Sequence, residues 1–141
     1  MATNVVTTDW KGNMEFESDN PSQHKLTIYD ASEEQGDKVG YGPKALMLSS
    51  LAGCSGLDVA SLLKKMRAEP ENFKMVITAD LTEEHPKYYH KVKVDYHFYG
   101  TSLKEDKIKK AVDLSVDRYC GVMEMFKKFA EVTTEIHLHE K

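Results

Sequence analysis

The sequence predicts an α+β protein, in which antiparallel sheets surround one long central helix. Apolar and polar residues alternate over 73–81 and 90–99, which is the two-residue period of strands with one buried face. Over 43–67 the apolar residues recur at every third or fourth position, which is the period of an amphipathic helix. Strand signals precede this helix, and further strand and helix signals follow it, an order that favours the α+β class.

The first part of the chain predicts an antiparallel meander of short strands. Turn signals stand at Lys11-Gly12-Asn13 and Asn20-Pro21-Ser22. The segment 31–41 carries Ser, Gly, Asp and two Glu residues, which predicts an exposed loop. Pro43 follows this loop and suits the first position of a helix, where its missing N–H is not needed. The strands are expected at 3–9, 11–18 and 24–30.

The central helix, expected to end near Arg67, has one apolar face that would form the spine of the core. A second feature is the lack of side-chain bulk around Cys54, which would let another helix approach closely. The apolar face consists of Leu48, Leu51, Ser55, Val59, Leu62 and Met66. The small residues are Ser49, Ser50, Ala52, Gly53, Ser55 and Gly56.

The remaining elements follow from the same periodicities. The two alternating segments predict half-buried antiparallel strands that are joined around His85-Pro86. A second amphipathic helix is expected over 103–118, with Ile108, Ala111, Val112 and Leu114 on its apolar side. A short helix is expected from Cys120 to about Ala130, and a last strand over 132–139.

Size and composition limit the functions open to the chain. Its 141 residues suit a single domain over 1–141. Nineteen basic residues are scattered among 23 acidic ones, for a net charge of −4, which argues against a nucleic-acid surface. No apolar run approaches the roughly 20 residues of a membrane span. The N-terminal residues lack the pattern of a signal peptide, so we expect a cytoplasmic protein whose thiols stay reduced.

The chemistry centres on the two cysteines of the chain. Cys54 follows the small residues of the central helix, and Cys120 precedes the short helix near the C-terminus. These two segments, over 42–58 and 113–122, resemble the OsmC/Ohr family of osmotically inducible and organic hydroperoxide resistance proteins. Pro43 at the start of an apolar helix and the order of the elements agree with this resemblance, which covers most of the chain.

The resemblance implies an intertwined homodimer, with the central helices back to back and active sites at the interface. It also implies a thiol-dependent peroxidase that reduces organic hydroperoxides in oxidative-stress defence. In that scheme Cys54 is the peroxidatic residue and Cys120 the resolving one. They form a disulfide after Cys54 becomes sulfenic acid, and a dithiol reductant resets the pair. No cofactor and no metal are expected.

Two positions depart from the family pattern. Lys44 follows Pro43 where the family carries a glutamate, and no arginine occurs before Arg67. Lys11 or Lys44 would supply positive charge without the bidentate geometry of an arginine. Asp58, four residues after Cys54 on the same helix, would oppose a Cys54 thiolate by charge repulsion.

Local electrostatics leave the roles of the cysteines open. Helix N-terminal amides would stabilise an anion at Cys120, and Arg118 either adds positive charge there or faces solvent. On this local view Cys120 can equally be the attacking residue. Cys54 lies about three turns inside its helix, where the dipole contributes little.

Several alternatives use the same residues. The cysteines also suit a thiol-disulfide oxidoreductase or redox sensor, a non-catalytic binder of a hydrophobic small molecule at the dimer interface, or two structural core positions. A triad of Cys54, a histidine and Asp58 is disfavoured, because Asp58 adjoins the cysteine directly. His137 and His139 share one strand face with Glu135, within reach of His97 or His90, but a terminal surface strand explains them without a metal.

Overall fold

The computed structural model describes residues 2–30 and 39–141, which fall into two compact units. The first lies within Met1–Met47 and the second spans Leu48–Lys141. The boundary falls near the start of helix α1 (Pro43–Lys65), which begins at the proline expected for it. A single domain over 1–141 stays a prediction, and each unit is described by itself.

The N-terminal unit is the expected antiparallel meander, with strand order β1-β2-β3. Its first turn lies later than the sequence indicates, because Gly12 and Asn13 take positive φ angles of 101° and 49° and carry the strand through Gly12. The first strand also begins later, at Thr8 instead of residue 3. Of the expected loop, 31–38 lies outside the described residues. The strands are β1 (Thr8–Gly12), β2 (Glu15–Ser18) and β3 (Leu26–Tyr29).

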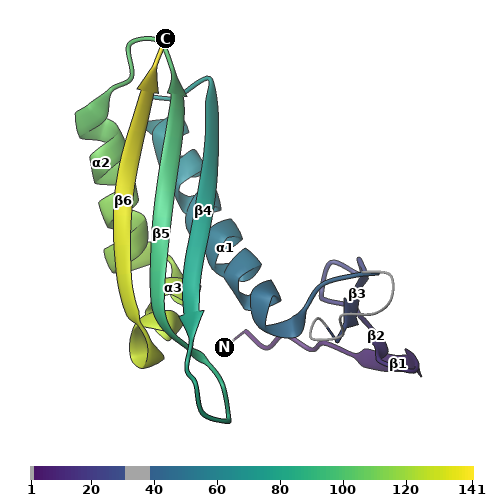
Figure 1. Ribbon diagram of the computed structural model, residues 1–141. Coiled ribbons are helices and arrows are strands. Elements are labelled where there is room, and N and C mark those ends of the chain that lie inside the picture. Colours follow the sequence, from purple (N-terminus) through teal and green to yellow (C-terminus); the bar gives the residue numbers. More distant parts are fainter. Residues whose placement is uncertain (1, 31–38) are drawn as a thin grey trace. The chain divides into compact units, whose positions relative to one another are not determined.

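The second unit is built on a three-stranded sheet of order β4-β5-β6 (Figure 1). Strands β4 (Asn72–Leu81) and β5 (Tyr89–Gly100) pair antiparallel, as predicted. Strand β6 (Glu131–Glu140) pairs parallel to β5, so the expectation of purely antiparallel sheets is wrong for this pairing. The reason is the connection. The chain crosses over through helix α2 (Glu105–Leu114), the π-helical turn η1 (Ser115–Tyr119) and helix α3 (Gly121–Phe129), and it re-enters the sheet in the same direction.

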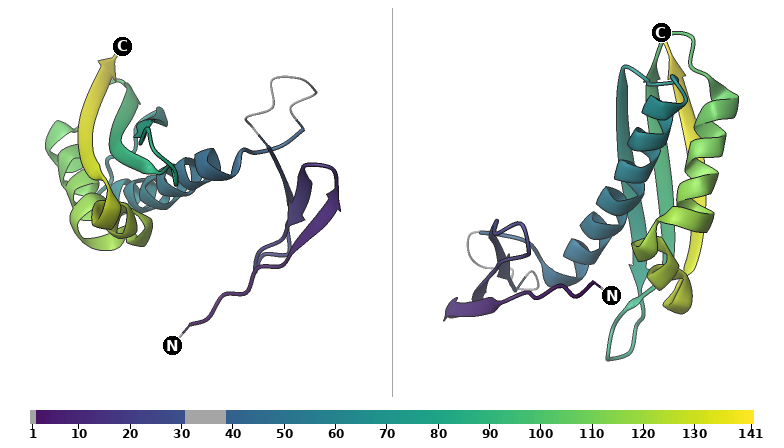
Figure 2. Two further views of the ribbon diagram at one scale, coloured as in Figure 1. Left: turned by 60° about the horizontal axis from the view of Figure 1, so that its bottom comes forward. Right: turned by 180° about the vertical axis from the view of Figure 1, so that it is seen from behind.

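Helices cover one face of this sheet, and the core lies between them and the strands (Figure 2). Val94, Tyr96 and Phe98 of β5 point to that face and are fully buried. Phe73 of β4 stacks on Phe98, with ring centroids 4.6 Å apart. The alternation predicted for β5 is therefore the alternation between this core and the outer face.

The helix expected over 103–118 is interrupted. It consists of α2 (Glu105–Leu114) and a π-helical turn, η1 (Ser115–Tyr119), and α3 (Gly121–Phe129) follows directly. The Cys120 N–H donates to the Ser115 carbonyl at 2.9 Å and closes the wide turn. Ser115 is fully buried at the point where the helix changes. Such π turns often mark functional positions.

Helix α1 packs on the core through Leu51, Ser55, Val59 and Leu63. The sequence pattern named Leu62 in place of Leu63, but the buried positions follow a strict four-residue spacing. By length and composition alone α1 could cross a membrane, so the expectation that no apolar run approaches a membrane span is wrong by this measure. Its apolar stripe contacts the protein core, although only 22% of the apolar window is buried.

Candidate active site

The two cysteines, 66 positions apart, come together within the second unit. Cys54 projects from α1, Asp58 lies one turn later on the same helix, and Cys120 precedes α3. The two Sγ atoms and a carboxylate oxygen of Asp58 all lie within 4.8 Å of one another. Both cysteines are free thiols. The arrangement therefore places two thiols where they can react with the same small molecule and with each other.

Cys120 is the N-cap residue of α3, and its sulfur accepts a hydrogen bond from the Met123 N–H at 3.3 Å. This amide lowers the pKa of the thiol, as the sequence led us to expect. Burial acts in the opposite direction and is the larger effect, because only 4% of the residue is exposed. Burial, followed by the hydrogen bond with Cys54, raises the pKa of Cys120 to about 12. Cys120 therefore stays protonated at neutral pH.

Cys54 is the more accessible of the pair, since it is half-buried where Cys120 is buried. It sits on the side of α1 between the buried stripe and the surface. Reactivity of a cysteine requires both access and ionisation. Access thus favours Cys54 over Cys120 as the residue that meets an incoming substrate.

A chain of buried hydroxyl groups adjoins the thiols and was not foreseen as part of the site. Ser55, next to Cys54, shares hydrogen bonds with Tyr96 at 2.7 Å and with Ser115 at 2.8 Å. The Ser115 hydroxyl also lies within donating distance of Asp58 Oδ2, at 3.2 Å. All three hydroxyl residues are fully buried. The chain links β5, α1 and η1 and ends at the carboxylate beside the sulfurs.

Tyr96 is held neutral by this setting. Burial raises its pKa to about 12, and the Ser55 hydroxyl opposes the shift only in part. The negative charge of Asp58, and that of Cys120 at the high pH where its thiol ionises, add to the rise. The sequence did carry a signal for these residues: Ser55 interrupts the apolar face of α1, and Tyr96 occupies an inward position of β5. What it did not show is that they meet.

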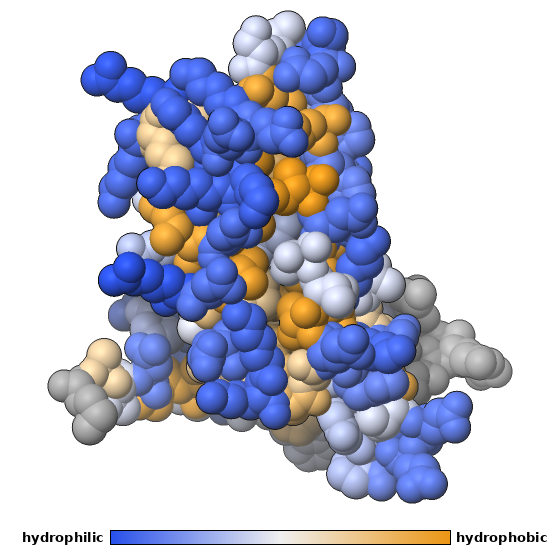
Figure 3. Space-filling model, turned by 90° about the vertical axis from the view of Figure 1, so that its left-hand side faces the viewer, coloured by the Kyte–Doolittle hydropathy of each residue, from blue (hydrophilic) through white to orange (hydrophobic). Residues whose placement is uncertain are grey.

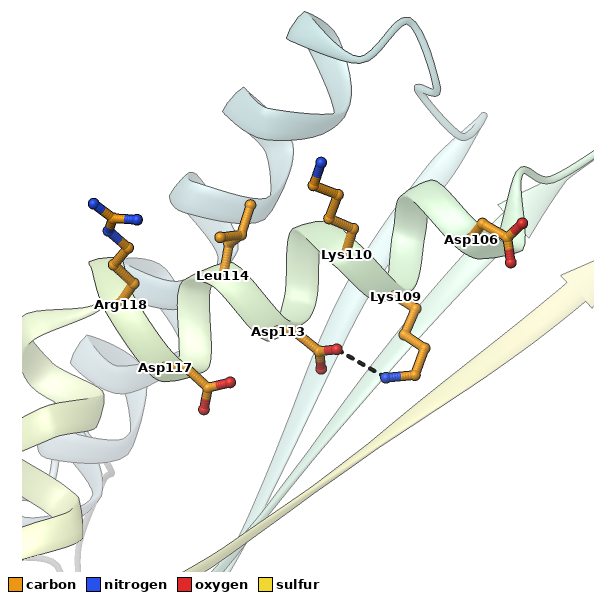
Figure 4. Close-up of a pocket in the computed structure, with 7 residues that line it drawn as sticks. All are labelled: Asp106, Lys109, Lys110, Asp113, Leu114, Asp117 and Arg118. Atoms are coloured by element: carbon orange, nitrogen blue, oxygen red, sulfur yellow. Dashed lines mark hydrogen bonds and ion pairs between the residues drawn. The ribbon is translucent and has the colours of Figure 1, made fainter.

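Among the described residues, the charged side chain that shifts the pKa of Cys120 is Asp58 and not a lysine or arginine. Arg118 is exposed, with its guanidinium 5.7 Å from the centre of the Tyr119 ring. It lines a shallow surface pocket along α2 and η1 (Figure 4). Of the two alternatives for Arg118, the structure therefore favours solvent. Lys11 and Lys44 are exposed residues of the N-terminal unit.

The pocket in Figure 4 is a charged surface groove and contains neither cysteine. The Lys109 ammonium forms an ion pair with Asp113 Oδ2 at 2.8 Å within it. The side of the molecule on which α2 and β6 lie is mainly hydrophilic, with apolar residues showing between the charged ones (Figure 3). The pocket's lining residues are Asp106, Lys109, Lys110, Asp113, Leu114, Asp117 and Arg118.

Three of the six histidines, His97, His137 and His139, gather on the outer face of the sheet. His97 Nδ1 lies 3.0 Å from His139 Nε2, and His97 stacks on His137 with centroids 4.4 Å apart. His137 Nε2 lies 2.8 Å from Asp95 Oδ1. Lys93 already neutralises the acidic members of this cluster, with its ammonium 2.8 Å from Glu135 and 3.4 Å from Asp95. These contacts suit the surface-strand interpretation.

Comparison with known proteins places the chain in a family. A model of the OsmC-like protein family matches residues 35–135. The chain belongs to the OsmC-like family. Among curated relatives of this family member, protein YhfA of Escherichia coli K12 is 30% identical over 124 residues, which cover 88% of this chain and 90% of that protein.

Solved structures share the OsmC-like fold over nearly the whole chain. A hypothetical protein from Aquifex aeolicus is 29% identical with a TM-score of 0.81, and the match covers 99% of this chain and 100% of that one. The organic hydroperoxide resistance protein OhrB of Bacillus subtilis has a TM-score of 0.69 at 15% identity, with coverage of 96% and 98%. The predicted α+β fold and the family resemblance are thus confirmed.

Proposed function

We propose that this OsmC-like protein is a thiol-dependent peroxidase that reduces organic hydroperoxides and serves in oxidative-stress defence. The observation that carries the proposal is the meeting of an accessible and a buried thiol within 4.8 Å. Membership of the family supports a redox or peroxide-related function. The proposed location is the cytoplasm, where thiols are kept reduced between turnovers.

In the proposed reaction the more accessible thiol, Cys54, meets the peroxide, and the buried thiol, Cys120, acts in the second step. The Cys54 thiolate attacks the outer oxygen of the hydroperoxide, the O–O bond breaks, and the leaving alkoxide takes a proton to become an alcohol. Cys54 is then sulfenic acid. The Cys120 sulfur attacks Cys54 Sγ, and its proton leaves with the sulfenic hydroxyl as water. One hydroperoxide and two thiols thus give one alcohol, one water and one disulfide, which a dithiol reductant returns to the thiols.

The test is a peptide mass map of the reduced protein after brief exposure to cumene hydroperoxide, with hydrogen peroxide in parallel. A Cys54–Cys120 disulfide that forms faster with the organic peroxide is the expected result. A Cys54→Ser variant should consume no peroxide. A Cys120→Ser variant should instead stop at a sulfenic acid on Cys54, which dimedone labels. Thiols that persist in the parent protein after exposure would overturn the proposal.

We also propose that the protein acts as a homodimer, with the outer side of α1 against a second copy. A Cβ built on Gly53 would meet nothing within 4 Å, and Leu57, on the same helix, is 75% exposed. Among residues 2–30 and 39–47, none is buried, and Trp10 is 66% exposed. An antiparallel meander of three short strands without a buried face needs a further surface to pack on. Analytical ultracentrifugation tests the dimer directly.

A second candidate, a disulfide-based redox sensor or thiol-disulfide oxidoreductase, is favoured by Asp58. Its carboxylate lies beside both sulfurs, and its negative charge adds to the rise in the pKa of Cys120. Disulfide exchange with a small dithiol, without peroxide consumption, would support this candidate. Peroxide consumption over many turnovers with excess dithiol distinguishes the two.

A further inference from the structure

The reduced thiol pair and Asp58 have the composition of a metal site. Zinc in proteins is held by cysteine sulfur at about 2.3 Å and by carboxylate oxygen at about 2.0–2.2 Å in tetrahedral geometry. Ligand atoms of such an ion are about 3.5–3.8 Å apart by this geometry. The two sulfurs and the carboxylate oxygen already lie within 4.8 Å of one another. Side-chain adjustments of about an ångström would therefore close the set around an ion.

We propose that Cys54, Asp58 and Cys120 form a reversible binding site for one thiophilic divalent cation of the Zn²⁺ class. This inference concerns the reduced protein and does not depend on peroxide turnover. Cys54 and Asp58 stand four residues apart on α1, the spacing that brings two ligands to one helix face. Cys120 approaches from the start of α3 as an independently anchored third ligand.

Hydrogen bonds to the proposed ligand atoms would hold them in position, as they do in known metal sites. The Met123 N–H donates to Cys120 Sγ at 3.3 Å, which suits a thiolate ligand. The Ser115 hydroxyl lies 3.2 Å from Asp58 Oδ2 and leaves the other carboxylate oxygen available to a metal. Ser115 is in turn held by Ser55. Hydrogen bonds from neighbouring groups to the metal ligands fix the geometry of those ligands and strengthen metal binding.

Charge gives the site its preference for a divalent cation. The Asp58 carboxylate lies within 4.8 Å of both sulfurs and supplies a negative charge at the site. A bound Zn²⁺ would attract this carboxylate and take the sulfurs as thiolates. Binding therefore releases two thiol protons to solvent. Three protein ligands leave the fourth position open to water or a small ligand, as in other zinc sites that are not closed.

The metal-bound and disulfide states exclude each other, since a Cys54–Cys120 disulfide removes both thiolate ligands. Occupation by Zn²⁺ should thus protect the pair from oxidation. The outer cluster of Asp95, Glu135 and His137 offers an internal comparison. It also brings ligand atoms within 4.8 Å, but the Lys93 ammonium already occupies the carboxylates. A His137→Ala variant is therefore the matched control.

The experiment is titration of the reduced, metal-free protein with Co²⁺, followed by displacement with Zn²⁺. We expect one Co²⁺ per chain, sulfur-to-cobalt charge-transfer absorption in the near ultraviolet, and visible bands of tetrahedral cobalt. Two protons should be released per ion in weak buffer. Cys54→Ser and Cys120→Ser should each weaken binding at least tenfold, Asp58→Asn about tenfold, and His137→Ala should leave it unchanged, with circular dichroism verifying each fold.

A second measurement needs no variant: protein oxidised to the Cys54–Cys120 disulfide, or alkylated at Cys54, should lose the sulfur-to-cobalt band. Absence of that band in the reduced parent would overturn the proposal. So would cobalt binding that survives Cys54→Ser but disappears in His137→Ala, which would assign the ion to the outer sheet face. A protein that binds cobalt through sulfur but consumes no peroxide would refute the peroxidase and leave the metal site standing.

Discussion

The hydroxyl chain behind the cysteines gives a prediction whose size follows from its connectivity. Ser55 lies at its centre, between Tyr96 and Ser115. In Ser55→Ala, the fully buried Tyr96 hydroxyl loses its hydrogen bond to Ser55. The Ser115 hydroxyl keeps its hydrogen bond to the Asp58 carboxylate. An unsatisfied buried polar group costs about 1–3 kcal/mol. The higher helix propensity of alanine returns about 0.5 kcal/mol. Unfolding free energy should fall by about 1–2 kcal/mol.

Tyr96→Phe should cost less, about 1 kcal/mol, because Ser55 then keeps its bond to Ser115. In the Ser55→Ala background the same tyrosine change should cost nothing or restore stability, since it removes the orphaned hydroxyl. A coupling energy of about 1–2 kcal/mol is therefore expected between the two positions. This double-mutant cycle cancels the helix-propensity term, which is present in both Ser55 variants.

The assay is urea unfolding of the four proteins, followed by far-ultraviolet circular dichroism under reducing conditions. Midpoints should shift at constant m-value, which keeps the comparison one of stability alone. Additive effects of the two substitutions would refute the reasoning. That result would mean that the Tyr96 hydroxyl finds another partner when Ser55 is lost.

Three further predictions concern reactivity, pH and assembly. Iodoacetamide at pH 8 should label Cys54 before Cys120, because Cys120 is 4% exposed and burial raises its pKa to about 12; mass spectrometry of partly labelled protein checks the order, and equal rates would contradict it. The hydrogen bond from His137 lowers the pKa of Asp95, so its stabilising contribution should be present above the ordinary aspartate pKa and be lost as pH falls through the lowered value. Urea midpoints measured from pH 5 to pH 2 should thus fall less steeply in Asp95→Asn than in the parent. Gly53→Ala should raise the unfolding free energy of the monomer by about 0.5–1 kcal/mol, because helical alanine is favoured and its Cβ meets nothing within 4 Å, yet weaken a dimer packed on that face. Sedimentation at several concentrations separates these effects, with Gly56→Ala, whose Cβ would meet Met75 Sδ at 3.2 Å, as the comparison.

Local periodicity was sufficient to predict the elements whose formation depends on near neighbours. Strand β4 and helix α1 begin within one residue of the expected positions, and α1 starts at Pro43 as its missing N–H requires. The parallel direction of β6 was not accessible, because it depends on how the intervening helices cross the sheet. The π turn likewise has no local sequence signal; it begins at Ser115, which is buried in the folded protein.

The candidate site was predictable in its thiols and not in its surroundings. Cys54 and Cys120 stood out because the chain has two cysteines, each in a recognisable segment. The hydroxyl chain joins residues 41 and 60 positions apart, and such pairings follow from tertiary packing alone. The direction of the Cys120 pKa shift also depends on tertiary packing, so the local sequence could not predict it. The helix-start amide was correctly expected, but burial, which no local window reveals, is the larger effect.

The difference in burial between Cys54 and Cys120 bears on the order in which the two thiols act in the proposed reaction. The attacking cysteine must lose its proton before it meets the peroxide, since only the thiolate is nucleophilic. The resolving cysteine is under a weaker constraint, because its proton leaves with the sulfenic hydroxyl as water during disulfide formation. A buried thiol with a pKa of about 12 is poorly suited to the first role and adequate for the second. The same burial limits the access of solution oxidants to Cys120. Local electrostatics left either order open. With burial included, we propose Cys54 for the first step and Cys120 for the second.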